Sequence, residues 1–154
     1  MADYYGTTLC REPFAVKTPD KFERLLKKCG IHKESDSESG LWYARQEDKF
    51  EIYGYNGLGS IYTDDESIES VEIGDIIQPF LLPGEVAAFI EVGTTKCRYE
   101  ESGGYAVVIT SKEVKYFSLY DWVEKTAKEL RNEEFHLKVE KDGKTKRDKI
   151  SEQV

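Results

Sequence analysis

The acidic side chains of this chain are grouped, and grouped carboxylates can bind a positively charged surface. No Lys or Arg occurs between Lys49 and Lys96, although this interval holds nine carboxylates. It therefore accounts for the entire formal net charge of −8. Like charges at this density repel one another and raise the free energy of the compact state, a cost that a basic partner would relieve. The nine are Glu51, Asp64, Asp65, Glu66, Glu69, Glu72, Asp75, Glu85 and Glu91.

Tyrosines stand immediately before the densest part of this acidic segment. A Tyr ring buries a large area at little entropic cost and stacks on Arg side chains. We therefore predict a partner-binding surface for a basic protein, and its residues are Tyr53, Tyr55, Tyr62, Asp64, Asp65, Glu66, Glu69, Glu72 and Asp75. The simpler alternative is a solvated acidic loop that keeps the protein soluble, with the tyrosines covering a sheet.

Residues for catalysis or metal binding are few and scattered. The two His residues, His32 and His136, are not near a candidate nucleophile, and no Gly-rich phosphate loop, nucleophile elbow or HExxH motif occurs. The pair Asp64–Asp65 lacks the alternate spacing and terminal Glu of a calcium loop. Cys97 has cationic neighbours that can lower a thiol pKa, but strand alternation favours a buried filler. We predict a protein that is not an enzyme and has no catalytic residue, metal or cofactor.

Cysteine content and net charge predict the cellular compartment of the protein and the classes of partner that it does not bind. Three widely spaced Cys residues suggest neither a disulfide scaffold nor a zinc site, so a reducing cytoplasm of the host cell is expected. No stretch approaches the roughly 18 apolar residues of a membrane span, and the N-terminus does not resemble a signal peptide. Nucleic acid and anionic membranes would repel a chain of pI near 4.9. We predict no direct nucleic-acid or membrane binding.

Two amphipathic helices and several strands are expected to position these residues. Thr18 as N-cap, Pro19 in the first turn and Gly30 as stop signal predict a helix at about 18–30. Ser118 and Asp121 have capping-box spacing and predict a second helix at about 119–131 that packs on the sheet.

Strands are predicted from alternating or continuous apolar residues. Two nearly continuous runs, Glu85–Val92 and Tyr105–Thr110, are typical of central strands covered on both faces. The pair Asn56-Gly57 predicts a tight hairpin turn. The remaining strands are expected near Phe14–Val16 and at Leu41–Arg45, Lys49–Tyr55, Leu58–Thr63 and Val114–Phe117.

These elements predict an α+β fold in one domain, with a mainly antiparallel twisted sheet packed by the helices at about 18–30 and 119–131. The domain is expected to span residues 1–131, because 154 residues with 39% hydrophobic content suit one core. Residues 132–154 form a charged C-terminal extension. The alternation of Phe135, Leu137 and Val139 suggests an edge strand there, followed by a frayed tail.

Two segments resemble a family of small acidic, largely uncharacterised proteins of phages and other mobile genetic elements. The first is GEVAAFIEVGTTKCRYEESGGYAVVIT, Gly84–Thr110, followed by Val114 and by LYDW at Leu119–Trp122. The second is EPFAVKTPDKF, Glu12–Phe22. This chain departs from the family in a longer turn at Glu100–Gly104 and in its charged tail. The resemblance implies an accessory, anti-defence role, such as an anti-CRISPR or anti-restriction protein, and brings no catalytic motif.

Together these observations predict an acidic, non-enzymatic protein-binding module. Its expected role is to inhibit a host nucleic-acid-binding defence system, a restriction or CRISPR effector, by stoichiometric occlusion as a nucleic-acid mimic. The expected partner is a basic protein surface. The alternative is a homo-oligomeric structural or adaptor protein, in its simplest form a homodimer, whose acidic loop only solubilises it. An enzyme is the third reading, for which a deep pocket with convergent carboxylates would be needed.

Overall fold

The computed structural model describes residues 4–34, 40–55, 61, 71–95 and 103–140 of the chain. The chain divides into two compact units, Met1–Tyr120 and Asp121–Val154. The predicted strand Leu58–Thr63, the turn Asn56-Gly57 and the tail after residue 140 lie outside the described residues, apart from Ile61, which is buried.

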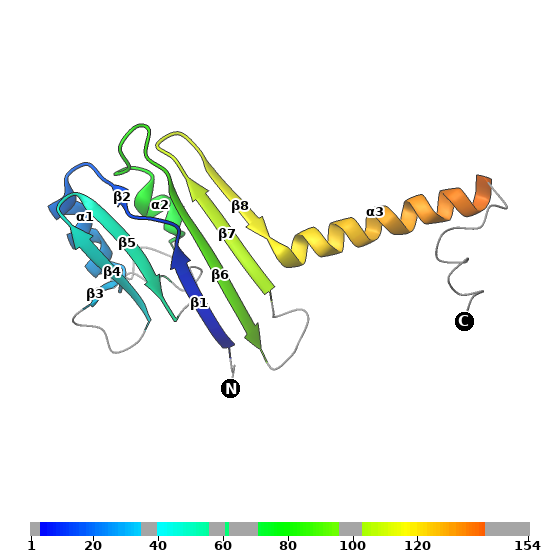
Figure 1. Cartoon of the computed structure of the whole chain (residues 1–154), viewed down its shortest axis with the longest axis horizontal. Coiled ribbons are helices and arrows are strands. Elements are labelled where there is room, and N and C mark those ends of the chain that lie inside the picture. Colours follow the sequence, from blue (N-terminus) through cyan, green and yellow to red (C-terminus); the bar gives the residue numbers. More distant parts are fainter. Residues whose placement is uncertain (1–3, 35–39, 56–60, 62–70, 96–102, 141–154) are drawn as a thin grey trace. The chain divides into compact units, whose positions relative to one another are not determined.

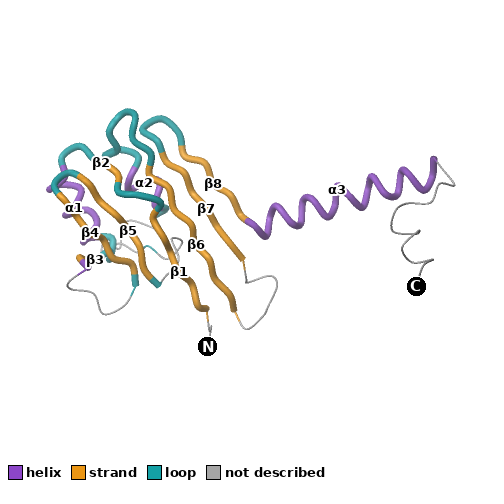
Figure 2. Tube along the Cα trace, in the orientation of Figure 1, coloured by secondary structure: helices purple, strands orange, loops and turns teal. Residues whose placement is uncertain are grey.

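A mainly antiparallel sheet forms the first unit, which confirms the α+β class predicted from the sequence (Figure 1, Figure 2). Its strands follow the order β3-β4-β5-β1-β6-β7-β8, and β2 pairs with β5 off this path. The pairing of β3 with β4 is parallel, which makes the sheet mixed. The strands are β1 (Tyr4–Cys10), β2 (Phe14–Ala15), β3 (His32–Lys33), β4 (Leu41–Gln46), β5 (Lys49–Gly54), β6 (Ala87–Thr95), β7 (Gly103–Ile109) and β8 (Val114–Ser118).

The first predicted helix is confirmed as α1 (Pro19–Lys28), but its N-terminus differs from the prediction. Thr18 adopts a left-handed conformation with φ 43° and makes no side-chain capping bond. An N-cap side chain requires extended backbone, so Thr18 cannot act as one in this conformation. Instead, the Thr18 carbonyl accepts the first helical hydrogen bond from the Phe22 amide at 3.1 Å.

A short helix that the sequence did not predict, α2 (Ile73–Ile77), follows the acidic segment. Glu72 and Asp75 form a capping box at its start. Ile73, Ile76 and Ile77 are buried while both acids are exposed. The helix thus turns its Ile side chains toward the core and its two acids toward water.

Both α1 and α2 cover one face of the sheet, which we call the helix face, and the opposite face is the outer face (Figure 1). Phe22 of α1 packs edge-on against Phe50 of β5, with ring centroids 4.8 Å apart, and both are fully buried. The same core includes Ile76 of α2, Phe89 of β6 and Val107 of β7. The core thus lies between the helices and the strands β5, β6 and β7.

The two apolar runs form neighbouring strands inside the sheet, β6 and β7, as predicted. Their predicted burial on both faces is wrong. Ile90 and Val92 of β6 are 56% and 58% exposed, and Val108 of β7 is 43% exposed. All three alternate with buried residues, so they lie on the outer face. A continuous apolar run does not reveal whether its second face is covered.

The ends of the described chain differ most from the prediction. The strand β1, which lies between β5 and β6, was not predicted. The second predicted helix exists as α3 (Leu119–Glu140) and continues through Phe135, Leu137 and Val139, so the edge strand predicted there is wrong. The intervening Glu, Lys and Arg residues are good helix formers, and adding a residue to an existing helix is easy. The packing of this helix on the sheet and the division at residue 131 stay predictions.

Candidate functional site

Four of the nine predicted partner-binding residues have a described position: Tyr53, Tyr55, Glu72 and Asp75. The other five lie outside the described residues, namely Tyr62, Asp64, Asp65, Glu66 and Glu69.

Tyr53 and Tyr55 belong to an aromatic group on the outer face. Their rings contact Trp42 of β4 edge-on, with centroid separations of 5.8 and 5.3 Å. Partial burial, together with the carboxylate of Glu34, raises the pKa of Tyr53 to about 12. Tyr55 is 68% exposed and is free to contact a partner.

Glu72 and Asp75 lie on the helix face, at the start of α2. Asp75 accepts a hydrogen bond from the Glu72 amide at 3.3 Å, as part of the capping box. Because Tyr53 and Tyr55 lie on the outer face, the sheet separates them from these two carboxylates. The described members of the predicted surface are therefore not brought together.

Two other tyrosines do meet the acidic segment, and the sequence reasoning missed them. The rings of Tyr105 (β7) and Tyr116 (β8) lie 5.9 Å apart on the helix face, and the Tyr116 hydroxyl donates a hydrogen bond to the Glu72 carboxylate. Burial and the Glu72 charge raise the pKa of both phenols, and a further negative charge acts on each, from Asp75 on Tyr116 and from Glu91 on Tyr105. We call these residues the acidic tyrosine cluster: Glu72, Asp75, Glu91, Tyr105 and Tyr116.

A glycine lets α2 approach the cluster closely. A Cβ atom at Gly74 would lie 2.6 Å from the Tyr116 hydroxyl oxygen and 3.0 Å from a Val114 methyl carbon. The first distance is shorter than real Cβ contacts and the second is tight, so only Gly fits here without a shift of a neighbouring side chain. This contact fixes the start of α2, and with it Glu72, against β8.

Two of the three cluster carboxylates, those of Glu72 and Asp75, are accessible to a partner. Glu72 and Asp75 are exposed and form no ion pair with a described Lys or Arg side chain. Tyr116 is 43% exposed beside them. This arrangement offers carboxylates to an Arg or Lys side chain and a ring face on which a guanidinium group can stack.

Strand alternation in β7 and β8 was the signal that could have identified these tyrosines. Val107 pairs with Tyr116, and Tyr105 lies two residues before Val107, so all three share a face. The sequence reasoning instead used proximity along the chain, which selected Tyr53 and Tyr55.

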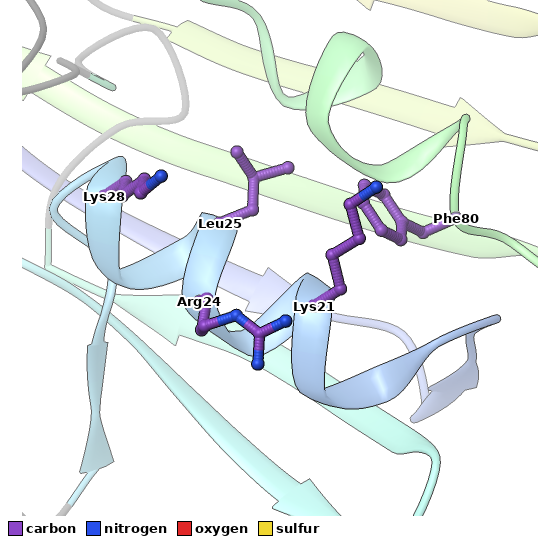
Figure 3. Close-up of a pocket in the computed structure, with 5 residues that line it drawn as sticks. All are labelled: Lys21, Arg24, Leu25, Lys28 and Phe80. Atoms are coloured by element: carbon purple, nitrogen blue, oxygen red, sulfur yellow. The ribbon is translucent and has the colours of Figure 1, made fainter.

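A pocket of opposite charge lies between α1 and the segment after α2 (Figure 3). Its volume is about 260 Å³, and it is lined by Lys21, Arg24, Leu25, Lys28 and Phe80. The three cations come from successive turns of α1 and surround apolar side chains, and the lining contains no carboxylate. A second shallow pocket of about 500 Å³ lies on the outer face beside Ala44 and Glu51. Among the described residues that line them, neither pocket has the convergent carboxylates that an acid–base enzyme would need.

Other chemistry is limited among the described residues. They contain no group of three or more His, Cys, Asp or Glu side chains that could hold a metal ion. Cys10 and Cys29 are free thiols, and burial raises the pKa of each. None of the described helices combines the length and apolar character needed to cross a membrane.

Comparison with known proteins adds no assignment: no protein-family model, curated protein or solved structure matches the chain. The resemblance to small acidic mobile-element proteins therefore stays a prediction.

Proposed function

We propose that this protein is a non-enzymatic binding module that inhibits a host nucleic-acid-binding defence protein by covering its basic surface. The observation that supports this proposal most strongly is the acidic tyrosine cluster, in which exposed carboxylates lie next to an exposed Tyr ring. The restriction or CRISPR effector that the resemblance implies is the proposed target, and the host cytoplasm is the proposed location.

Charge placement supports this proposal physically. Glu72 follows the segment Asp64–Glu69 directly in sequence, and no Lys or Arg interrupts the acids. A groove that binds phosphates also attracts carboxylates, and complementary potentials accelerate association and exclude wrong partners. The inhibitor would then act by stoichiometric occupation of the groove, without chemistry.

The test is a competition titration. The partner is first captured from host lysate and identified by mass spectrometry, and its binding to a labelled DNA or RNA is then measured while this protein is added. We expect nucleic acid to be displaced at a ratio of about one to one, and less effectively as salt shortens the screening length from about 8 Å at 0.15 M to about 3 Å at 1 M. Displacement that does not change with salt contradicts the proposal.

Charge reversal locates the surface within the acidic segment. The four-fold variant Asp64→Lys, Asp65→Lys, Glu66→Lys and Glu69→Lys is expected to lose displacement while its thermal unfolding stays cooperative. Reversal of three exposed acids far from the cluster in sequence, Glu12, Glu47 and Asp48, serves as the control and should retain most displacement. If the four-fold variant displaces nucleic acid as well as the parent does, the acidic segment is not the binding surface.

The homo-oligomeric adaptor remains a second candidate, because one specific observation favours it. The outer face of the sheet exposes large apolar side chains on four neighbouring strands, β1, β6, β7 and β8. The two candidates differ in their response to salt, since apolar association is not weakened by screening.

A further inference from the structure

The outer face of the sheet exposes several large apolar side chains on neighbouring strands. Leu9 is 59% exposed, and Ile90 and Val92 next to it are exposed to a similar degree. Val108 and Phe117 extend the surface toward the edge strand β8. Contiguous apolar patches beyond a few hundred Å² on soluble proteins mark interaction sites.

The pairing register arranges this surface in three rows that cross the strands from β5 to β8. Thr8 pairs with Gly54, which places Tyr53 beside Leu9, and the remaining strand pairs continue each row. The middle row is Tyr53, Leu9, Ile90, Ala106 and Phe117. The rows on either side are Glu51, Arg11, Ala88, Val108 and Lys115, and Tyr55, Thr7, Val92 and Gly104.

Charge occurs in only one of these rows, and its ends have opposite signs. Glu51 stands on β5 at one end, and Lys115 stands on β8 at the other. Arg11 lies between them, where its amide donates to the Ala88 carbonyl at 2.8 Å and its side chain pairs with Glu12 at 3.2 Å. The other two rows contain no charged side chain.

We propose that two copies of this chain bind each other through the outer face, around a two-fold axis that runs along the strands over β6. This rotation places β5 of one copy over β8 of the other and leaves every residue in its own row. Glu51 of each copy then meets Lys115 of the second copy, so the opposite charges pair twice. Self-complementarity of this kind is what a two-fold interface requires.

The apolar rows are complementary under the same rotation. In the middle row Leu9 faces the small Ala106 of the second copy, Tyr53 faces its Phe117, and Ile90 faces itself. In the third row Thr7 faces Gly104. Leu9 and Thr7 thus lie over small residues beside the axis, Ile90 and Val92 each meet their own copy on the axis, and aromatic rings meet at the margin, as in the core of two stacked sheets.

The area of the face suits a dimer. The five strands from β5 to β8 in spatial order, at about 4.8 Å per strand and over about six residues of 3.3 Å each, cover about 480 Å² in projection. Because side chains protrude from the sheet, the accessible area of the face is larger than this projection and approaches the roughly 800 Å² per partner of a standard interface.

The experiment measures the molar mass of the full chain by sedimentation equilibrium. We expect twice the 17.7 kDa of the single chain, at about 0.15 M and also at about 1 M salt, because screening does not weaken apolar contacts. The variant Ile90→Glu places two carboxylates on the axis and is expected to be monomeric with an unchanged far-ultraviolet circular dichroism spectrum. Lys28→Glu, on α1 across the sheet, is the control and should stay dimeric.

A charge swap tests the arrangement itself, with variants that only exchange exposed or half-exposed charges. Glu51→Lys alone places a Lys side chain opposite Lys115 of the second copy, and Lys115→Glu alone places a Glu side chain opposite Glu51. Each single variant thus brings like charges together at both margins and is expected to weaken the dimer severalfold. The double variant, and an equimolar mixture of the two single variants, should both restore it.

Two results overturn the proposal. A parent chain that is monomeric at about 100 µM would mean that the outer face is not a self-association surface, because a specific interface of standard size is expected to form at that concentration. If the Ile90→Glu variant is still a dimer, the interface lies elsewhere. The same follows if the equimolar mixture of the Glu51→Lys and Lys115→Glu variants dimerises no more strongly than either variant alone.

Discussion

Arg45 shows how single residues join α1 to the sheet. Its guanidinium lies 2.8 Å from an Asp20 carboxylate oxygen and 2.5 Å from one of Glu23, both on α1. The Tyr43 hydroxyl donates to Glu23 at 2.6 Å. This phenolic hydrogen bond and the Arg45 charge lower the pKa of Glu23. The arrangement could not be predicted from sequence, because the partners are 20 to 25 residues apart.

The lowered pKa of Glu23 predicts how stability depends on pH. The folded state binds this proton less tightly than the unfolded chain, whose Glu pKa is about 4.3, so the stabilisation is complete above that pH and is lost as pH falls through the folded pKa. We expect Glu23→Gln to lower the free energy of unfolding at pH 7 by about 1.5–3 kcal/mol and to reduce its decline below about pH 5. Urea unfolding at several pH values measures both, with the exposed Glu12→Gln as control. Parallel pH profiles for Glu23→Gln and the parent would refute the assignment.

The partner-binding residues illustrate what single positions reveal. The position of the negative charge along the chain could be read directly, and Glu72 and Asp75 are exposed as the surface requires. The sequence does not reveal which tyrosines accompany these acids, because Tyr116 and Glu72 are more than forty residues apart in the chain. Only the register of β7 with β8, and the packing of α2 on that edge, bring these side chains together.

At the scale of elements, the packing of α2 against β8 depends on Gly74. Ala favours an isolated helix over Gly by about 1 kcal/mol, but the added methyl would overlap the Tyr116 hydroxyl oxygen, and overpacking costs about 1–3 kcal/mol. We therefore expect Gly74→Ala to be destabilising in the parent and less so in a Tyr116→Phe background, which lacks that oxygen but keeps the Val114 contact. A double-mutant cycle from urea midpoints measures the difference. Additive effects would show that the two residues do not contact each other.

Elements with strong local signals were predictable, and those specified by distant contacts were not. Pro19 and Gly30 bracket α1, and the runs of β6 and β7 are recognisable from their apolar residues. The strand β1, YYGTTLC, lacks the alternation of apolar and polar residues that marks a strand, and it is placed in the sheet by its pairing with β5 and β6. The predicted edge strand at residues 135–139 was wrong because alternation over three apolar residues is weaker than the helix propensity of their neighbours.

At the scale of the whole molecule, the two proposed surfaces use opposite faces of one sheet. The acidic tyrosine cluster lies on the helix face, and the proposed dimer surface lies on the outer face, so a dimer would present two clusters. Avidity would then strengthen binding to a partner with two basic sites. We expect Ile90→Glu to weaken binding to such a partner while its affinity for a single-site fragment stays unchanged. Titration calorimetry with both forms measures this, and an equal loss for both would argue against bivalency.

The central claim is that the location of the carboxylates, and not the total negative charge, produces binding. It is tested most directly by the affinity of the captured partner for two variants of equal net charge. One neutralises the cluster with Glu72→Gln, Asp75→Asn and Glu91→Gln, and the other neutralises three distant exposed acids with Glu12→Gln, Glu47→Gln and Asp48→Asn. At about 0.15 M salt we expect the first variant to bind at least tenfold more weakly than the parent and the second to bind within about twofold of it, since distant exposed charges are screened. Equal affinities of the two variants would contradict the account.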